Sequence, residues 1–443
     1  MSAYSDRYQL YLAMLERPFK KVTRLEFLQP DNSVAFALGG SNQKTTAVGR
    51  DTRAFIQSGN LSVNLQNGQR RTASVTLSNL DSAFDYAVNK LWFGQRLRLS
   101  MGIDLPSLGE FYLPQGVFYV RNPDNLISYK ERTTTLSLAD KWAYLDGSLF
   151  GTLDASYVVS RGTDIFSAIA SLLKLNKYTY GSGETDPLKM IDSIAPVFTD
   201  YYTGRTYSAT NSDGSITTDI QMTDTPYDIN EERGSSIGSL ILKLNDMLAG
   251  LIGYDATGAL RLDPSQDDVS DADKPILFSF GMDRPNLAKL SENPKPSEVY
   301  NTVIIAGEGL TETSVWAKAS NLDPTSDTNV NIIGMKLHTE EKADYWNADQ
   351  CASLARWQLK RKTILQKSVS IESTQMFHLY ENGLVSVRRT DKPGSPMEKH
   401  LIQGFSIPLA ETGSMSISCV SVNDIPNFTV ETHTSDEQPA PES

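Results

Sequence analysis

Arg71-Thr72-Ala73-Ser74-Val75-Thr76-Leu77-Ser78 alternates polar and apolar side chains with a period of two. Such alternation is typical of a β-strand with one buried and one solvated face. Similar strands are predicted at 97–101, 116–120 and 133–138, separated by Gly, Asn and Asp, while helical patterns are scarce. We therefore expect residues 1–146 to form an antiparallel sheet folded into a barrel or a sandwich, and we assign them as an N-terminal β-barrel domain.

The hydrophobic period changes after residue 147. It predicts helices at 163–176 and 235–248, each beginning with residues that can cap a helix. A hairpin is predicted at 253–262, where a Thr-Gly turn joins two short strands. Residues 147–296 are therefore expected to form an α+β domain inserted between two β regions.

Residues 297–366 are predicted to hold a strand and the longest helix of the chain, at about 340–362. Glu340 and Glu341 would stand at the start of this helix and Lys360-Arg361-Lys362 at its end. This charge order is the one that the helix dipole favours, so we interpret the basic cluster as a solvated helix end rather than as a DNA-binding patch.

Residues 367–430 return to a period of two and predict a second β-barrel region. Residues 431–443 are polar and acidic and are expected to form a disordered tail. The fold class predicted for the whole chain is α+β, mainly β: two antiparallel, tube-like β-barrels with an α+β insertion and a long helix before the last barrel.

A faint internal repeat links the two β regions. Gly94 and Gly116 precede or begin strands in the first region and are 22 residues apart. Gly383 and Gly404 stand at similar places in the second region, 21 residues apart. This spacing suggests two related barrels separated by the insertion.

Composition narrows the chemistry of the protein. The chain has 443 residues and a formal net charge of −12, which disfavours a protein that holds nucleic acid by neutralising phosphates. Its two cysteines, Cys351 and Cys419, lack the paired spacing of a zinc site or redox motif, and its four histidines are isolated. We expect inert thiols in a reducing compartment and no histidine-based metal centre.

No segment is expected to enter a membrane. The longest apolar stretch, 240–252, is broken by Lys243, Asn245 and Asp246. The apolar run at 8–15 lacks a small-residue cleavage site, so it predicts an amphipathic helix and not a signal peptide. We expect a soluble protein made in the cytoplasm.

Two groups of carboxylates are the candidate chemical sites. The first is an acidic loop that could bind calcium, although it lacks the Asp-x-Asp-x-Asp-Gly order of a calcium loop, so a solvated loop is preferred. Its residues are Asp263, Asp267, Asp268, Asp271 and Asp273. The second could supply paired carboxylates for glycoside hydrolysis. Its residues are Asp224, Asp228, Glu231 and Glu232.

Motifs for nucleotide binding and for a nucleophilic serine are absent from the sequence. We therefore assign no catalytic residue, no cofactor-binding residue, no metal ligand and no cofactor, and we predict that the protein is not an enzyme. An acidic, β-rich hydrolase of cell wall or glycans is the alternative, and a secreted adhesin module is a third class, disfavoured because no signal peptide is predicted.

The order of several segments resembles the tail-hub, or baseplate-hub, proteins of tailed bacteriophages. Thr72–Asn79, Leu91–Leu99, Pro114–Phe118 and Leu138–Trp142 are similar in order to the N-terminal barrel of that family. The segments Tyr300–Gly307, Leu401–Leu409 and Gly413–Met415, with a helix between the first two, are similar to its second barrel. The resemblance covers most of residues 1–425.

This resemblance implies a structural virion protein at the distal tail tip. It implies a homotrimer whose six barrels face a hexameric distal tail or tail tube protein and whose channel lets DNA leave without binding it. The other implied partners are the tape measure protein and tail fibre or receptor-binding components, with assembly in the cytoplasm of the host bacterium. Because the chain stops soon after the second barrel, receptor binding or cell-wall cleavage by this polypeptide is not expected.

Overall fold

The computed structural model describes residues 3–433 with gaps. The residues left out within that range are 30–31, 44–46, 86–93, 130, 176–178, 181–183, 186–205, 211–215, 222, 226, 249, 264–273, 285, 295–296, 298, 308–314, 342–347, 364–366, 390–396 and 423–427.

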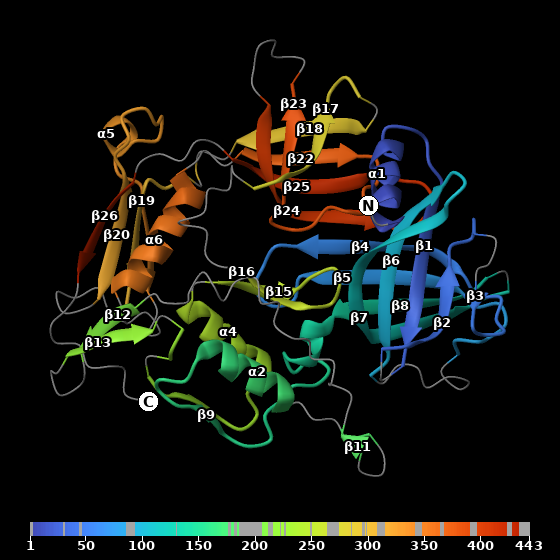
Figure 1. The fold of residues 1–443 in the computed structure, drawn as a ribbon, viewed down its shortest axis with the longest axis horizontal. Helices are drawn as coiled ribbons and strands as arrows, with labels where there is room; N and C mark the ends of the chain where they lie inside the picture. The colour runs from blue at the N-terminus through green and yellow to red at the C-terminus, as the bar shows by residue number, and fades with distance from the viewer. Residues whose placement is uncertain are drawn as a thin grey trace.

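The first third of the chain is almost entirely β-structure (Figure 1). Its elements are α1 (Ala3–Met14), β1 (Lys21–Leu28), β2 (Val34–Gly39), β3 (Ala47–Val48), β4 (Ile56–Asn64), β5 (Arg71–Ser78), β6 (Arg96–Leu105), β7 (Gly109–Ile127), β8 (Arg132–Asp140) and the 3-10 helix η1 (Lys141–Tyr144).

Short strands and two helices make up the middle of the chain. Its elements are β9 (Tyr157–Val159), α2 (Ile165–Leu175), β10 (Thr179–Tyr180), β11 (Glu184–Thr185), β12 (Thr206–Thr210), β13 (Ile216–Gln221), β14 (Ile229–Glu231), α4 (Ile237–Met247), β15 (Leu251–Tyr254) and β16 (Leu260–Asp263).

The last third returns to β-structure around one long helix. Its elements are β17 (Ile276–Gly281), β18 (Leu287–Pro294), β19 (Thr302–Ala306), β20 (Trp316–Asn321), α5 (Val330–Ile333), β21 (Leu337–Glu341), α6 (Ala348–Thr363), β22 (Lys367–Ser373), β23 (Leu384–Arg388), β24 (Glu398–Pro408), β25 (Met415–Val422) and β26 (Phe428–His433).

The two predicted β regions join into one 14-stranded sheet. Its main path runs β18-β22-β25-β24-β4-β5-β8-β7-β6-β1-β2-β3, and β23 and β17 branch from β24. We call β4, β5, β8, β7 and β6 the first half-sheet and β18, β22, β25, β24 and β23 the second. The mainly β, antiparallel character is confirmed, but the described strands form an open path and not two closed barrels. Beyond β6 the sheet continues through β1 and β2 and curls back, so that Gly40, just after β2, bridges Ile56 at the start of β4.

The two half-sheets repeat the same strand order. In the first, β4-β5-β8-β7-β6 run side by side, and β18-β22-β25-β24-β23 follow the same order in the second. Each contains a meander of three consecutive strands, β6-β7-β8 and β23-β24-β25. Gly94 and Gly383 stand just before these two meanders. Gly116 and Gly404 are not equivalent, because the bulges described next align Gly404 with Asn122.

β-bulges make the match residue-specific. The β4–β5 ladder shifts between Ile56 and Ser58, and the β18–β22 ladder shifts between Leu287 and Lys289. A bulge inserts one extra residue and locally increases the twist, so its position is a structural marker. Leu287 and Ile56 are therefore equivalent positions.

A second bulge confirms the alignment. The β7–β8 ladder shifts between Val120 and Asn122, and the β24–β25 ladder shifts between Ile402 and Gly404. In the first half, the strand pairing places the first bulge beside Thr134 of β8 and the second beside Leu138 of β8. In the second half, it places them beside Met415 and Cys419 of β25. The two bulges are therefore four residues apart in both halves. Asn122 is thus equivalent to Gly404.

One hydrophobic core extends beneath both half-sheets. It contains Leu61 and Val75 from the first, Ile371 and Ile407 from the second, and Tyr11 of α1. The helix predicted at 8–15 is present as part of α1, which packs beside β6. Because the core is continuous, the halves fold as one body.

The middle of the chain holds two helices and several short strands. Helix α2 begins after Asp164, whose side chain accepts a hydrogen bond from the amide of Ser167, and α4 begins after Ser236, which caps it in the same way. The two helices share a core with the predicted hairpin, β15 and β16. The domain ends earlier than predicted, because β17 and β18 belong to the second half-sheet.

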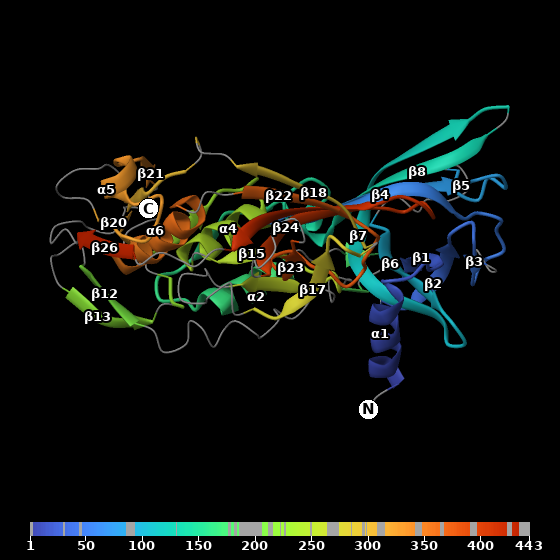
Figure 2. The same ribbon diagram turned by 90° about the horizontal axis from the view of Figure 1, so that it is seen from above.

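A separate four-stranded sheet, ordered β21-β19-β20-β26, is covered by α6 (Figure 2). Glu340 and Glu341 lie in β21 and not at a helix start, so the predicted dipole arrangement at that end is wrong. Two small residues of α6, Ala352 and Ala355, are buried in the core beneath this sheet. Residues 431–433, assigned to the tail, form the end of β26.

Candidate functional site: the joint between the half-sheets

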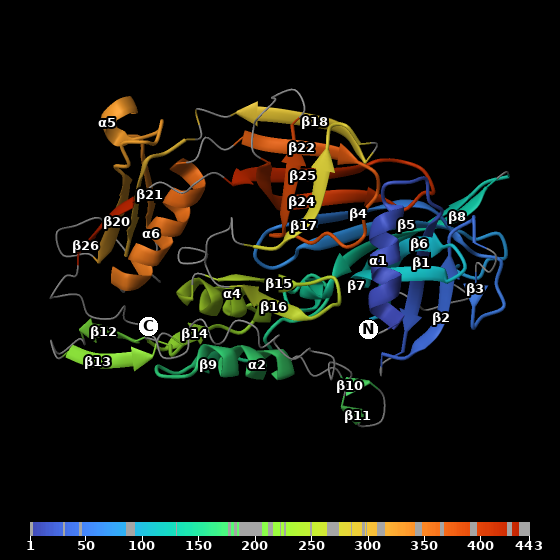
Figure 3. The same cartoon turned by 45° about the horizontal axis from the view of Figure 1, so that its top comes forward.

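The two half-sheets meet where β4 pairs antiparallel with β24. Asn64 lies opposite Gly404, Ser62 opposite Ser406 and Asn60 opposite Pro408. Figure 3 shows β24 and β4 side by side at the centre of the molecule. We call this β4–β24 ladder the joint. It unites strands that are far apart in the sequence, so the residues beside it decide how the two halves are oriented.

A buried ion pair lies beside the joint. Arg71, at the start of β5, contacts the carboxylate of Glu381 through Nη2 at 2.5 Å, and Arg70 Nη1 lies 3.8 Å from the same carboxylate. Arg71 also donates through Nη1 to the backbone carbonyl of Gln115. The side-chain Nε2 of Gln115 in turn donates to the carbonyl of Phe377 at 2.8 Å. These contacts bind the first half-sheet to the segment before β23.

Asp140 fixes the backbone on which the two arginines sit. Its Oδ2 accepts hydrogen bonds from the amides of both Arg70 and Arg71, each at 2.8 Å. Burial raises the pKa of Asp140 to about 6, and the hydrogen bonds from Arg71, Arg70 and Trp142 oppose that shift.

A lysine anchors the far end of β24. Lys21, at the start of β1, is 5% exposed and donates through Nζ to the carbonyls of Pro408 and Ala410. Burial lowers the pKa of Lys21 to about 7. Nζ of Lys21 thus donates to two carbonyl groups where β24 leaves the joint.

Helix α1 adds a third polar contact across the halves. The Tyr11 hydroxyl accepts from the amide of Phe377 at 2.8 Å and lies 3.0 Å from Nδ1 of His378. Burial lowers the pKa of His378 to about 4, so its ring is neutral at pH 7. Because Nε2 faces the carbonyl of Leu277, it carries the proton, and Tyr11 donates to Nδ1.

These residues were not predicted from the sequence, although a signal was present. Arg71 shares the inward parity of Ala73, Val75 and Leu77 in its strand, and all four are buried. Lys21 likewise opens a strand whose inward positions are apolar further on. A charged residue at an inward position predicts a buried partner, but the partner cannot be named without the fold.

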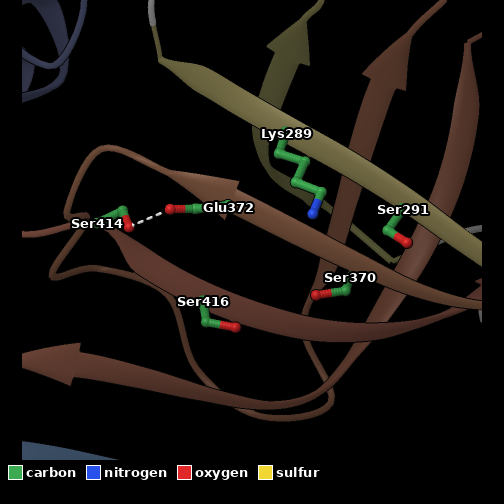
Figure 4. Close-up of a pocket in the computed structure, with 6 residues that line it drawn as sticks. All are labelled: Lys289, Ser291, Ser370, Glu372, Ser414 and Ser416. Atoms are coloured by element: carbon green, nitrogen blue, oxygen red, sulfur yellow. Dashed lines mark hydrogen bonds between the residues drawn. The ribbon is translucent and has the colours of Figure 1, made fainter.

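A shallow hollow on the second half-sheet is the second candidate site. It measures about 290 Å³ and is lined by Lys289, Ser291, Ser370, Glu372, Ser414 and Ser416 (Figure 4). The Ser414 hydroxyl donates to Glu372 at 2.5 Å, and Lys289 points across the hollow from β18. The lining lies on three neighbouring strands, which places the hollow against the outermost one, β18.

The four carboxylates predicted as a hydrolase alternative lie around β14, and two of them make structural contacts. Asp228 accepts from the amide of Arg161 at 2.6 Å, and Glu231 pairs with Lys243 at 2.5 Å. Partial burial and the nearby charge of Asp164 raise the pKa of Asp224. Glu232 is exposed.

The remaining predicted groups form no metal cluster among the described residues. Asp263 ends β16, while Asp267, Asp268, Asp271 and Asp273 lie outside the described residues. Cys351 and Cys419 are buried as free thiols, and burial raises the pKa of each to about 12. Within the described ranges no helix is long and apolar enough to span a bilayer.

Two half-sheets of the same order, joined edge to edge and carrying a helical insertion, define a class of protein: the fold is shared with phage tail proteins. A tail protein from Neisseria meningitidis MC58 matches with a TM-score of 0.53 and 10% identity, over 92% of this chain and 98% of that one. The 43 kDa tail protein of prophage MuSo2 from Shewanella oneidensis matches with a TM-score of 0.53 and 13% identity, over 90% and 98%.

No protein-family model matches the chain, and no curated protein matches it. At identities of 10% and 13% the similarity concerns the fold. At that level it confirms the resemblance found in the sequence.

Proposed function

We propose that the chain is a structural, non-enzymatic protein of a phage tail, and that three copies form a hub at the distal tail tip. The fold shared with two tail proteins supports a role in a tail. The observation that carries the proposal is the internal repeat, with its matching strand order and matching bulges.

The repeat explains how such a hub could change symmetry. Three copies present six half-sheets, which suit a hexameric distal tail or tube protein on one side and threefold components on the other. The tape measure protein and the fibre or receptor-binding components are the further partners of this proposal. A symmetric ring of this kind would enclose a channel for departing DNA.

The charge of the chain suits such a channel. The net charge of −12 repels phosphate, whereas a basic wall would hold DNA with a salt-dependent affinity. Filter binding of duplex DNA at 50 mM salt tests this part of the proposal. We expect no retention, and tight retention would overturn the passive channel.

The oligomeric state of the purified full chain tests the hub itself. Native mass spectrometry should give a species of three times 48.9 kDa, and negative-stain electron microscopy should show a ring with a central opening. A compact monomer at micromolar concentration would overturn the hub.

Turnover of purified peptidoglycan tests the proposal that the protein is not an enzyme. The ion pair of Glu231 and the backbone contact of Asp228 support structural roles for these carboxylates. We expect no soluble fragments from the wild-type chain. Fragments that disappear in Glu231→Gln or Asp228→Asn would establish the hydrolase instead.

A further inference from the structure

The two strands that are equivalent to those of the joint do not pair with each other over the described residues of one chain. In the alignment fixed by the bulges, β4 corresponds to β18 and β24 corresponds to β7. β4 pairs with both β5 and β24, whereas β18 pairs only with β22 among the described strands and stands at the end of the sheet. Figure 3 shows β18 as the outermost strand. The edge that β4 uses at the joint is therefore open in β18.

The matching edge of β7 is open as well. β24 pairs with β23 through its first residues and with β4 through its last ones. β7 pairs with β6 only as far as Tyr119, and beyond that point the described residues show β8 as its one neighbour. The ends of β7 and β8 project from the body of the protein in Figure 2. Residues 122–127 thus correspond to the part of β24 that makes the joint.

A side chain beside the joint is buried, whereas the equivalent side chain at the end of β7 is exposed. Leu409, just after β24, is buried, and its amide donates to the carbonyl of Gly59 at 2.8 Å. Its equivalent at the end of β7, Ile127, is 62% exposed, and its neighbour Leu126 is 53% exposed. Exposed apolar side chains beside an unpaired strand edge are a typical docking surface, which natural proteins otherwise avoid.

We infer that residues 124–127 of β7 in one copy pair antiparallel with β18 of a second copy of this chain. The inference rests on the proposed hub and names the contact that builds it. The joint supplies the register: Ile127 faces Leu290, Leu126 faces Ser291 and Asn125 faces Glu292. The contact is heterologous, because one copy contributes β7 and the other contributes β18. Repeated heterologous contacts form a ring when the rotation between copies closes.

The sequence limits the length of this ladder. Pro123 would face Pro294, where neither residue has an amide proton, so the ladder ends there. The pairs from Asp124 to Ile127 retain their amides. Prolines at this place also prevent a longer and less specific edge pairing.

Disulfide trapping in the full chain tests the register. Leu126 and Ser291 would form a non-hydrogen-bonded pair, whose Cα atoms lie about 4.5 Å apart, within the range of a disulfide. Leu126→Cys/Ser291→Cys should give covalent oligomers on non-reducing gels after oxidation with copper phenanthroline. Leu126→Cys/Lys289→Cys, two residues out of register, is the matched control. Both native cysteines are buried.

A positive control comes from the joint itself. Ser62→Cys/Ser406→Cys replaces a directly opposed pair and should form a disulfide within one chain. This variant shows that the oxidation conditions trap a strand pair of the expected geometry.

The outcomes separate this inference from the hub. If covalent trimers form at least tenfold faster than in the register control, both the edge pairing and the hub are supported. Covalent chains longer than three copies support the edge pairing and overturn the closed trimer. A trimer in native mass spectrometry without selective trapping overturns the edge pairing and leaves the hub standing. A monomer that cannot be trapped overturns both.

Discussion

Arg71 and Glu381 form a buried ion pair although 310 residues separate them in the sequence. Their side chains are 1% and 5% exposed. The guanidinium belongs to the first half-sheet, and the carboxylate belongs to the segment between β22 and β23 of the second. The pair therefore fixes the orientation of two segments that local structure cannot bring together.

Removing one charge of this pair should be costly. Glu381→Gln leaves the guanidinium of Arg71 buried without its counter-charge, so we expect the free energy of unfolding to fall by about 3 kcal/mol. Urea unfolding followed by tryptophan fluorescence measures the change. Arg71→Met/Glu381→Leu should regain most of the loss. A double variant less stable than Glu381→Gln would contradict this account.

The control for this experiment is an exposed pair. Glu16 and Arg284 lie 2.5 Å apart, with exposed fractions of 49% and 46%. Glu16→Gln should cost less than about 1 kcal/mol, because solvent screens the interaction.

Gly59 is required at the joint. Its φ is +142°, and an added Cβ would lie 2.0 Å from the carbonyl oxygen of Ser74. We expect Gly59→Ala to lower the free energy of unfolding by about 3 kcal/mol or more, since both strain and a backbone clash must be relieved. Gly162→Ala is the matched control: φ is +77° but nothing lies within 4 Å, so it should cost about 1–2 kcal/mol. Equal costs would refute the clash.

Lys21 should make stability depend on alkaline pH. The pKa of Lys21 is about 7 in the folded chain, whereas its ordinary value, which applies to the unfolded chain, is 10.5. Between pH 7 and pH 10.5 the unfolded chain therefore binds more protons than the folded chain. Stability contributed by this group therefore rises with pH, by up to about 1.4 kcal/mol per unit. The stability difference between wild type and Lys21→Met should grow from pH 7 to pH 10. Lys20→Met, which removes a more exposed charge, is the control.

Ile127 and Leu409 should respond in opposite ways to the same change. Leu409→Ser removes a buried side chain at the joint and should cost about 3 kcal/mol of folding stability. Ile127→Ser alters an exposed position and should leave monomer unfolding within about 0.5 kcal/mol of wild type. Native mass spectrometry should nevertheless show more monomer for Ile127→Ser. An unchanged oligomer would remove Ile127 from the contact.

The sequence predicted the local elements well because each depends on nearby residues. The period of two around Val75 and the caps at Asp164 and Ser236 are local signals, and all were confirmed. The helix start at Glu340 was wrong because Glu340 and Glu341 pair with β19, a partner that periodicity does not reveal. Separate barrels were expected because the sequence gives no sign that β4 pairs with β24.

The residues of the candidate site were harder to predict from the sequence than the local elements, because their partners are also distant in the chain. Arg71, Lys21 and Tyr11 each meet partners more than 300 residues away. Their inward parity predicts burial, whereas the identity of the partner depends on how the halves close upon each other. The carboxylates around Glu231 attracted attention by composition alone, and the structure gives Glu231 a lysine partner.

The covalent connection between β4 and β24 changes how a ring would assemble. Both strands of the joint belong to one polypeptide, so this pairing forms during folding at any protein concentration. A ring of three chains has six junctions, of which three are already made when each chain folds. Because the last contact of a ring closes within the complex, assembly then needs two association steps, where six separate half-sheets would need five. Assembly of the ring therefore depends less steeply on protein concentration.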